Sequence, residues 1–234
     1  MTRASITRTL ALVALAGLAV RLLGRSARVI DGGRRRRPSR RAVVANLQDA
    51  TSVDESTGAV RSVQTADLVL PEAALDEIWS PTHLERLART YWRFLTRATL
   101  GLIRVLYSET GRSIVLLARP FKLLTFAAPE YEMETSRGLV RWRIERGLLV
   151  ARRGREGGGY LQIEVRRRPC GDAENANLHV QVEVANFYPS IASGLGRRLY
   201  NATQSRIHVI LTRGFLRSLA RLDMPRSHVG RFER

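Results

Sequence analysis

The residue types that most often carry out catalysis or bind metal ions are few in this chain and stand apart from one another. The four histidines show no HxH or HxxxH spacing, and the single cysteine, Cys170, belongs to no CxxC motif. Zinc sites and disulfide bonds need several such side chains within reach of one another. We therefore expect no catalytic residue, no metal site and no cofactor, with a reactive thiol at Cys170 as the alternative to an incidental cysteine.

Two further motifs with catalytic potential, a phosphate-binding loop and a nucleophilic serine, also lack the neighbouring residues that they require. The glycine-rich stretch GREGGGY (residues 154–160) lacks the Lys-Ser/Thr pair of a phosphate-binding loop and does not lead from a strand into a helix. A hairpin turn accounts for it better. No serine lies in a GxSxG motif, so a nucleophilic hydrolase is not supported.

The chain is strongly basic, with a formal net charge of +18, but the charge is unevenly distributed. Lys122 is the only lysine among 39 basic residues, and such a skew toward arginine is typical of a GC-rich genome. Residues 1–41 hold eleven arginines against Asp31, a net charge of +10. Aromatic residues make up only 6% of the chain, so no surface for stacking bases is evident and nucleic-acid binding is not favoured.

The N-terminal residues combine an apolar run with an arginine cluster. The run Thr9–Val20 has no charge, but at about 1.5 Å per residue it is too short to span a bilayer core of about 30 Å. We interpret residues 1–24 as a membrane-anchor or signal-like segment, with an extension of no structural role as the alternative. We expect residues 25–66 to form an Arg-rich flexible linker that either contacts an anionic membrane surface or is merely solvated. The candidate membrane-contacting residues are Arg34, Arg35, Arg36, Arg37, Arg40 and Arg41.

Three segments in the second half of the chain, residues 138–145, 160–167 and 177–187, alternate apolar and polar residues with the period of half-buried strands. Shorter β-rich stretches precede them from residue 113 onward, so an antiparallel meander is predicted. The apolar positions share one sheet face and are the candidate ligand-binding residues: Val140, Trp142, Ile144, Leu161, Ile163, Val165, Val180, Val182 and Val184.

Helical patterns flank this meander. Pro71 begins a short helical pattern that Ser80-Pro81 interrupts, and a second pattern, with Trp92 as a core residue, runs on to Tyr107. Residues 190–222 carry an apolar stripe of helical period, predicting a long C-terminal helix packed on the sheet. Its candidate contacts with a ligand are Ile207, Leu211 and Phe215.

The stretch SGLGRRLYNATQSRIHVILTRGFLRSLARL resembles the terminal helix of bacterial START-like (SRPBCC) proteins, with Gly194, Arg198 and Gly214 at motif positions. The stretch LVLPEAALDEIWSPTHLERL resembles the opening of the same domains. The resemblance covers about residues 67–222 and implies an α+β helix-grip fold. In that fold a curved antiparallel sheet of about six or seven strands wraps a long C-terminal helix, giving a domain over residues 67–224 and a tail over 225–234.

The resemblance also implies a function, because many START-like proteins hold an apolar molecule between sheet and helix. We expect non-enzymatic binding of a hydrophobic small molecule, such as a lipid or polyketide, at the cytoplasmic face of a bacterial membrane, or in the cytoplasm if residues 1–24 do not anchor the chain. A polyketide cyclase or aromatase, with Arg141 or Arg143 pointing into the cavity, and a charge-driven nucleic-acid binder are the alternatives. Residue types do not distinguish a cavity from a solid core, and they leave the oligomeric state open.

Overall fold

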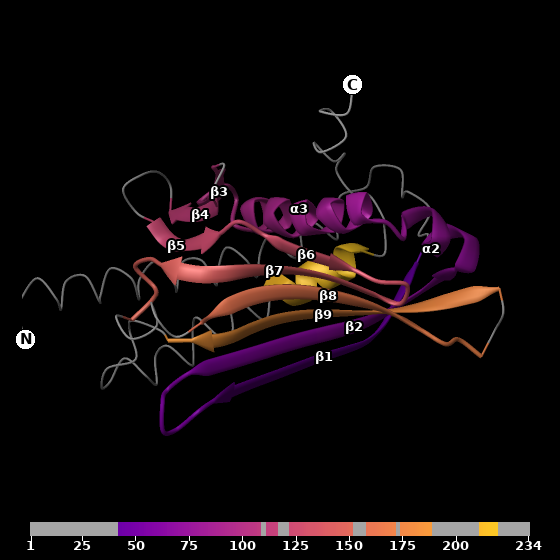
Figure 1. The fold of residues 1–234 in the computed structure, drawn as a ribbon, viewed down its shortest axis with the longest axis horizontal. Helices are drawn as coiled ribbons and strands as arrows, with labels where there is room; N and C mark the ends of the chain where they lie inside the picture. The colour runs from indigo at the N-terminus through magenta and orange to yellow at the C-terminus, as the bar shows by residue number, and fades with distance from the viewer. Residues whose placement is uncertain are drawn as a thin grey trace, which may run out of the picture.

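The computed structural model describes residues 42–108, 111–116, 122–151, 158–171, 174–188 and 211–219, and a single large sheet dominates them. Nine antiparallel strands pair in the order β1-β2-β9-β8-β7-β5-β4-β3, and β6 pairs with β7 outside this path (Figure 1). The strands are β1 (Val43–Val53), β2 (Val60–Pro71), β3 (Ile103–Tyr107), β4 (Gly111–Leu116), β5 (Lys122–Ala127), β6 (Glu130–Met133), β7 (Arg137–Arg146), β8 (Tyr160–Arg168) and β9 (Asn175–Phe187).

The inner face of the sheet is built from the alternating apolar residues of its four central strands. Val180 of β9 is paired with Ala66 of β2 on one side and with Val165 of β8 on the other. Because side chains alternate between faces along each strand, this register places apolar rows side by side across β2, β9, β8 and β7. The alternation seen in the sequence therefore does produce a buried sheet face.

Helices cover this face. The described helices are α2 (Glu72–Ile78), α3 (Pro81–Ala98) and a C-terminal helical segment over residues 211–219. Ser80 caps α3 by accepting a hydrogen bond from the His83 backbone N–H, and Pro81 occupies the first turn, where it needs no hydrogen-bond partner. The buried side of α3 carries Leu84, Leu87, Ala88, Tyr91, Trp92, Leu95 and Ala98.

The C-terminal helical segment packs against α3 through aromatic contacts. The rings of Tyr91 and Phe215 lie edge to face at 5.2 Å, and Phe94 contacts the same Phe215 ring at 6.4 Å. Trp92 extends the cluster to Trp142 of β7, with ring centroids 5.1 Å apart. Figure 1 shows this segment in yellow, near α3 and the sheet. The arrangement is α+β and consistent with a helix-grip fold, and nine residues of the terminal helix are described.

The predicted linker over residues 25–66 is wrong for its described part, because β1 and the first half of β2 lie within it. Strand β1 lies at the edge of the sheet and its residues are mostly exposed, so it carries no apolar alternation. In β2 the inner-face positions Ser62 and Gln64 are polar although both are buried. The sequence of this half of the strand therefore resembles that of a solvent-exposed segment. Residues 1–41 lie outside the described part of the chain.

The predicted strand count and the length of the second helix are corrected as well. The sheet has nine strands and not six or seven, because β1, the N-terminal part of β2, and β3 were not recognised. Helix α3 ends at Ala98 and does not continue to Tyr107, since Leu100 and Gly101 adopt positive φ angles of 52° and 78° that stop a right-handed helix. Residues Ile103–Tyr107 then pair with β4.

No helix among the residues described here is both long enough and apolar enough to cross a membrane.

Candidate ligand-binding pocket

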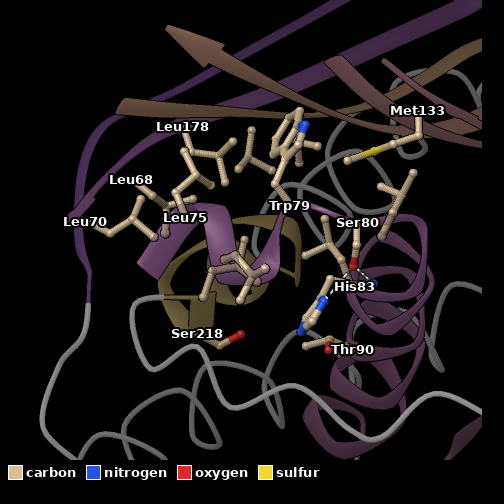
Figure 2. Close-up of a pocket in the computed structure, with 16 residues that line it drawn as sticks. Leu68, Leu70, Leu75, Trp79, Ser80, His83, Thr90, Met133, Leu178 and Ser218 are labelled. Atoms are coloured by element: carbon tan, nitrogen blue, oxygen red, sulfur yellow. Dashed lines mark hydrogen bonds between the residues drawn. The ribbon is translucent and has the colours of Figure 1, made fainter. Parts of the chain in front are cut away.

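A pocket opens between the inner face of the sheet, α2, α3 and the C-terminal helical segment, and Figure 2 shows the residues around it. Its cavity volume is about 60 Å³. Leu68, Leu70 and Leu178 form the sheet wall, while Leu75 of α2 and Leu84 of α3 are among the helical residues that line it. The walls are therefore largely leucine side chains, which favour an apolar occupant.

Four polar side chains also line the pocket, those of Ser80, His83, Thr90 and Ser218. They are not gathered at one point, because Ser80 and Thr90 are ten residues apart on α3, or about 15 Å along the helix axis. Thr90 Oγ1 donates to the Arg86 carbonyl oxygen at 2.8 Å, and Ser218 Oγ donates to the Phe215 carbonyl oxygen at 2.6 Å. Both hydroxyl protons are thus used within their own helices.

Hydrogen bonds with Ser80 and Arg86 fix the tautomer of the His83 ring. Arg86 Nη1 lies 2.9 Å from His83 Nε2, and because a guanidinium can only donate, Nε2 must accept. The ring proton is then on Nδ1, which donates to Ser80 Oγ at 2.8 Å. Burial first, and the positive charge of Arg86 second, hold the pKa of His83 below its ordinary value of 6.5, so the imidazole is neutral at neutral pH.

The described lining of the pocket contains no Arg, Lys, Asp or Glu side chain. In a chain with 39 basic residues this makes the pocket distinct from most of the surface. A ligand in contact with these residues therefore meets mainly apolar side chains, together with three hydroxyl groups, one neutral imidazole, the Trp79 indole and the Met133 sulfur.

Two of the predicted ligand-binding residues, Val165 and Val180, line the pocket. Most of the other predicted positions are buried, but they pack against one another and against the aromatic cluster and do not line this cavity. This group comprises Val140, Trp142, Ile144, Leu161, Ile163, Val182, Leu211 and Phe215, together with the partly buried Val184. Ile207 and the six candidate arginines between residues 34 and 41 lie outside the described residues.

Several lining residues were not predicted from the sequence. Trp79, Ser80, His83 and Met133 border the pocket because α2 and α3 meet there, across the edge of β6. The Ser80-Pro81 break between two helical patterns was visible in the sequence and marks this junction. What the sequence did not reveal is that the junction lies over the sheet leucines of β2 and β9.

The arginines that a cyclase would need inside the cavity point away from it. Arg141 donates to Gln162 Oε1 at 2.9 and 2.8 Å, and Arg143 donates to Glu130 Oε1 at 2.6 Å, both on the outer face of the sheet. Glu164 is buried on this same face beneath Arg137 and Arg166, both of which donate hydrogen bonds to it. The outer face therefore holds a layer of ion pairs and does not contribute to the pocket.

The described residues contain no group of three or more His, Cys, Asp or Glu side chains that could hold a metal ion. Cys170 is exposed.

The core between the sheet and α3 also holds polar atoms that find no hydrogen-bond partner among the described residues. They include Gln64 Oε1 and the indole Nε1 atoms of Trp92 and Trp142, all in residues that are at most 2% exposed. The Gln64 side-chain amide nitrogen donates to Ser62 Oγ at 2.8 Å. None of these residues lines the pocket described above.

No protein-family model matches the chain, and no curated protein matches it in sequence. Similar solved structures include human StAR-related lipid transfer protein 5, with 9% identity, a TM-score of 0.34, and coverage of 88% of this chain and 98% of that one. Truncated norcoclaurine synthase from Thalictrum flavum has 13% identity, a TM-score of 0.31, and coverage of 69% and 94%. A STAR-related lipid transfer protein fragment from Xanthomonas axonopodis has 14% identity, a TM-score of 0.28, and coverage of 74% and 98%.

These neighbours are START-like (SRPBCC) proteins, the superfamily that the sequence resembles. Their TM-scores of 0.28 to 0.34 leave the function of this chain open.

Proposed function

We propose that this protein binds an apolar small molecule, without converting it, in the pocket between the sheet, α2, α3 and the C-terminal helical segment. The observation that carries the proposal is a cavity of about 60 Å³ whose described walls are predominantly leucine, isoleucine, valine and methionine. Protein interiors are normally close-packed, with few voids larger than a water molecule, so a space of this size favours a binding pocket over a solid core. No array of polar side chains suited to catalysis lines the described walls.

The cavity sets the size of the part of the ligand that it can enclose. At about 10–15 Å³ per water-sized atom, the space accommodates about four to six non-hydrogen atoms. Burial of each CH₂ group contributes about 0.8 kcal/mol, so a short alkyl chain alone would bind with a Kd near the millimolar range. A longer ligand would extend out of the cavity beside the half-buried residues Trp79 and His83.

Native mass spectrometry of the full chain, followed by organic extraction, tests this proposal. We expect a stoichiometric adduct that extraction removes and identifies as an apolar molecule. A bare mass, together with no detectable binding of hexane by NMR, would contradict the proposal.

A pair of double variants makes the test specific to the pocket. Val165→Ile with Val180→Ile adds two carbon atoms to the lining, and we expect it to weaken binding of the ligand by about tenfold or more. Val140→Ile with Val182→Ile adds the same two carbons to equally buried positions on the same face that do not line the pocket. Ligand affinity should be unchanged in this control, whatever its effect on stability.

The N-terminal arginines support a second part of the proposal, that binding takes place at an anionic membrane surface. Each arginine near such a surface contributes about 1 kcal/mol. Replacing Arg34, Arg35, Arg36, Arg37, Arg40 and Arg41 by glutamine in the full chain should lower its affinity for phosphatidylglycerol-containing vesicles by about a hundredfold or more. Equal sedimentation of both proteins with anionic vesicles would contradict this part and leave the pocket unaffected.

A further inference from the structure

The side of α3 that faces away from the core carries a row of arginines, Arg86, Arg93 and Arg97. At about 100° per residue, their spacing places all three within about 40° of one another around the helix axis. The buried side chains of α3 lie on the opposite side of the helix. Arg93 and Arg97 are exposed, and Arg86 is half-buried. This arginine row extends for about 16 Å along the helix.

The arginine row differs from the arginines of the outer sheet face in its lack of carboxylate partners. Arg61 and Arg143, on the outer face, each donate to a glutamate, at 2.8 and 2.6 Å. Arg93 and Arg97 form no ion pair with a described residue. Glu85, the only acidic residue of α3, is bonded to another arginine of the same helix. The positive charge of this helix face is therefore available to an anionic partner.

An exposed apolar side chain lies at the end of α3. Leu100 is 64% exposed, and its φ angle of 52° lies in the left-handed region, where glycine or asparagine is usual after a helix. A leucine here gains neither burial within the chain nor a favourable backbone conformation. Arginines beside an exposed leucine match the boundary of a bilayer, where phosphate groups lie next to acyl chains. A nucleic-acid backbone would use only the arginines.

The arginine row also borders the candidate pocket. Thr90 lies three residues before Arg93 and four after Arg86, so it is their neighbour on the helix surface. Thr90 and His83 are half-buried and line the pocket from α3, as Figure 2 shows. A membrane that contacts the arginine row would therefore lie next to this side of the pocket.

We propose that the folded part of the chain lies on an anionic phospholipid bilayer through α3, with the arginine row on the lipid phosphates and Leu100 at the acyl boundary. The outer face of the sheet, on the side away from α3, then faces the aqueous phase. This inference rests on the membrane part of the proposed function, because it names a second surface that makes the same contact.

Sedimentation of the full chain with vesicles of phosphatidylglycerol and phosphatidylcholine tests the inference. Arg93→Gln with Arg97→Gln should weaken vesicle binding about tenfold or more, and added salt should reduce this difference. Leu100→Asn should weaken binding about fivefold at both low and high salt, because it removes an apolar contact. Asparagine suits the positive φ angle at this position, so the fold is retained.

Arg61→Gln with Arg143→Gln is the matched control. It removes the same number of positive charges from exposed arginines on the outer face of the sheet. Vesicle binding should stay within about twofold of the unaltered chain, because these side chains lie beyond screening distance of the bilayer. Hexane binding in the pocket should be unchanged in all of these variants, which shows that each of them is folded.

Three outcomes overturn the inference. Unchanged vesicle binding by Arg93→Gln with Arg97→Gln would show that the arginine row does not contact the bilayer. An equal loss in the control would show that only the net charge matters. Full binding by Leu100→Asn, together with binding of poly(U) that depends on Arg93 and Arg97, would show a site for polyanions in general.

The same assay separates this inference from the proposed function. If replacing the six N-terminal arginines abolishes vesicle binding while Arg93→Gln with Arg97→Gln retains it, the membrane part of the proposed function stands and the inference fails. The reverse result supports the inference and contradicts the role of the N-terminal arginines. If the unaltered chain does not sediment with anionic vesicles, both fail, and hexane binding still reports on the pocket.

Discussion

Val180 and Val182 are two neighbouring inner-face residues of β9, both fully buried, that differ in what they face. Val180 borders the cavity, whereas Val182 packs only against other side chains. Alternation alone identifies both as buried and cannot separate them, because the difference depends on where α2 and α3 cover the sheet. The sequence therefore predicts the sheet face from these residues, while it does not predict the pocket.

The difference between the two valines predicts opposite effects of the same substitution on stability. Val180→Ile places its extra carbon in empty space and should leave the free energy of unfolding unchanged or slightly raised. Val182→Ile must displace packed neighbours and should lower it by about 1 kcal/mol or more. Urea unfolding of the two variants checks this, and equal destabilisation would argue against an accessible cavity beside Val180.

Glu164 makes the sheet's outer face sensitive to acid. Burial would raise the pKa of its carboxyl group, but the hydrogen bonds from Arg166 and Arg137 outweigh burial and hold the pKa below its usual 4.5. A carboxyl group with a lowered folded-state pKa stabilises the fold above its unfolded-state pKa, and this contribution is lost as pH falls through the lower, folded-state value.

We therefore expect Glu164→Gln to reduce the free energy of unfolding at neutral pH by about 1–3 kcal/mol, and by less near pH 3, which lies below the unfolded-state pKa. The contrast between the two pH values, measured by denaturant unfolding, is the informative quantity. A loss of the same size at both would mean that Glu164 acts through packing rather than through its charge. Asp67, Glu130 and Asp54, whose pKa values are also lowered, keep some acid sensitivity in the variant.

At the scale of secondary-structure elements, β7 is followed by a glycine that no other residue can replace easily. Gly147 has φ of +151°, and a Cβ atom there would lie 2.1 Å from the Leu123 carbonyl oxygen. The residues that follow bond back to β5, through Leu148 N–H to the Lys122 carbonyl oxygen at 3.0 Å. This glycine thus allows the chain to turn closely along the neighbouring strand.

Gly147→Ala should lower the free energy of unfolding by about 2 kcal/mol or more, because the backbone of either β5 or β7 must shift. Gly171→Ala is the control, since a Cβ atom there meets open space and the φ angle is unstrained. Thermal unfolding of both variants distinguishes a specific backbone contact from a general effect of glycine replacement. Equal melting temperatures would show that the chain at Gly147 tolerates a side chain beside β5.

The elements that were predicted and those that were missed differ in burial. The strands β7, β8 and β9 have a buried inner face with strict alternation, and all three were found. Strand β1 is held mainly by its backbone pairing with β2, and its bulge between Ala45 and Gln48 interrupts the period of two. Apolar and polar residues alternate only in a strand that has one buried face. An exposed edge strand that pairs through its backbone therefore cannot be recognised from such alternation.

For the whole molecule, the protection of backbone amide hydrogens against exchange with solvent should follow the order of strands in the sheet. The central strands β2, β9 and β8 pair on both sides, whereas β1 and β3 lie at the edges. We expect amide hydrogens of β8 and β9 to exchange most slowly and those on the open side of β1 and β3 most rapidly. Native-state hydrogen exchange with mass spectrometry checks this order, and fast exchange in β9 would contradict the described pairing.

The pairing of β2 with β9 joins two segments that lie far apart along the chain. Leu68 is paired with Leu178, so this contact spans 110 residues by the difference of their numbers. During synthesis, the ribosome must therefore release nearly the whole chain before the centre of the sheet can close. Until then the hairpin of β1 and β2 presents an unpaired edge along β2, and its exposed backbone N–H and C=O groups can pair with another copy of the chain.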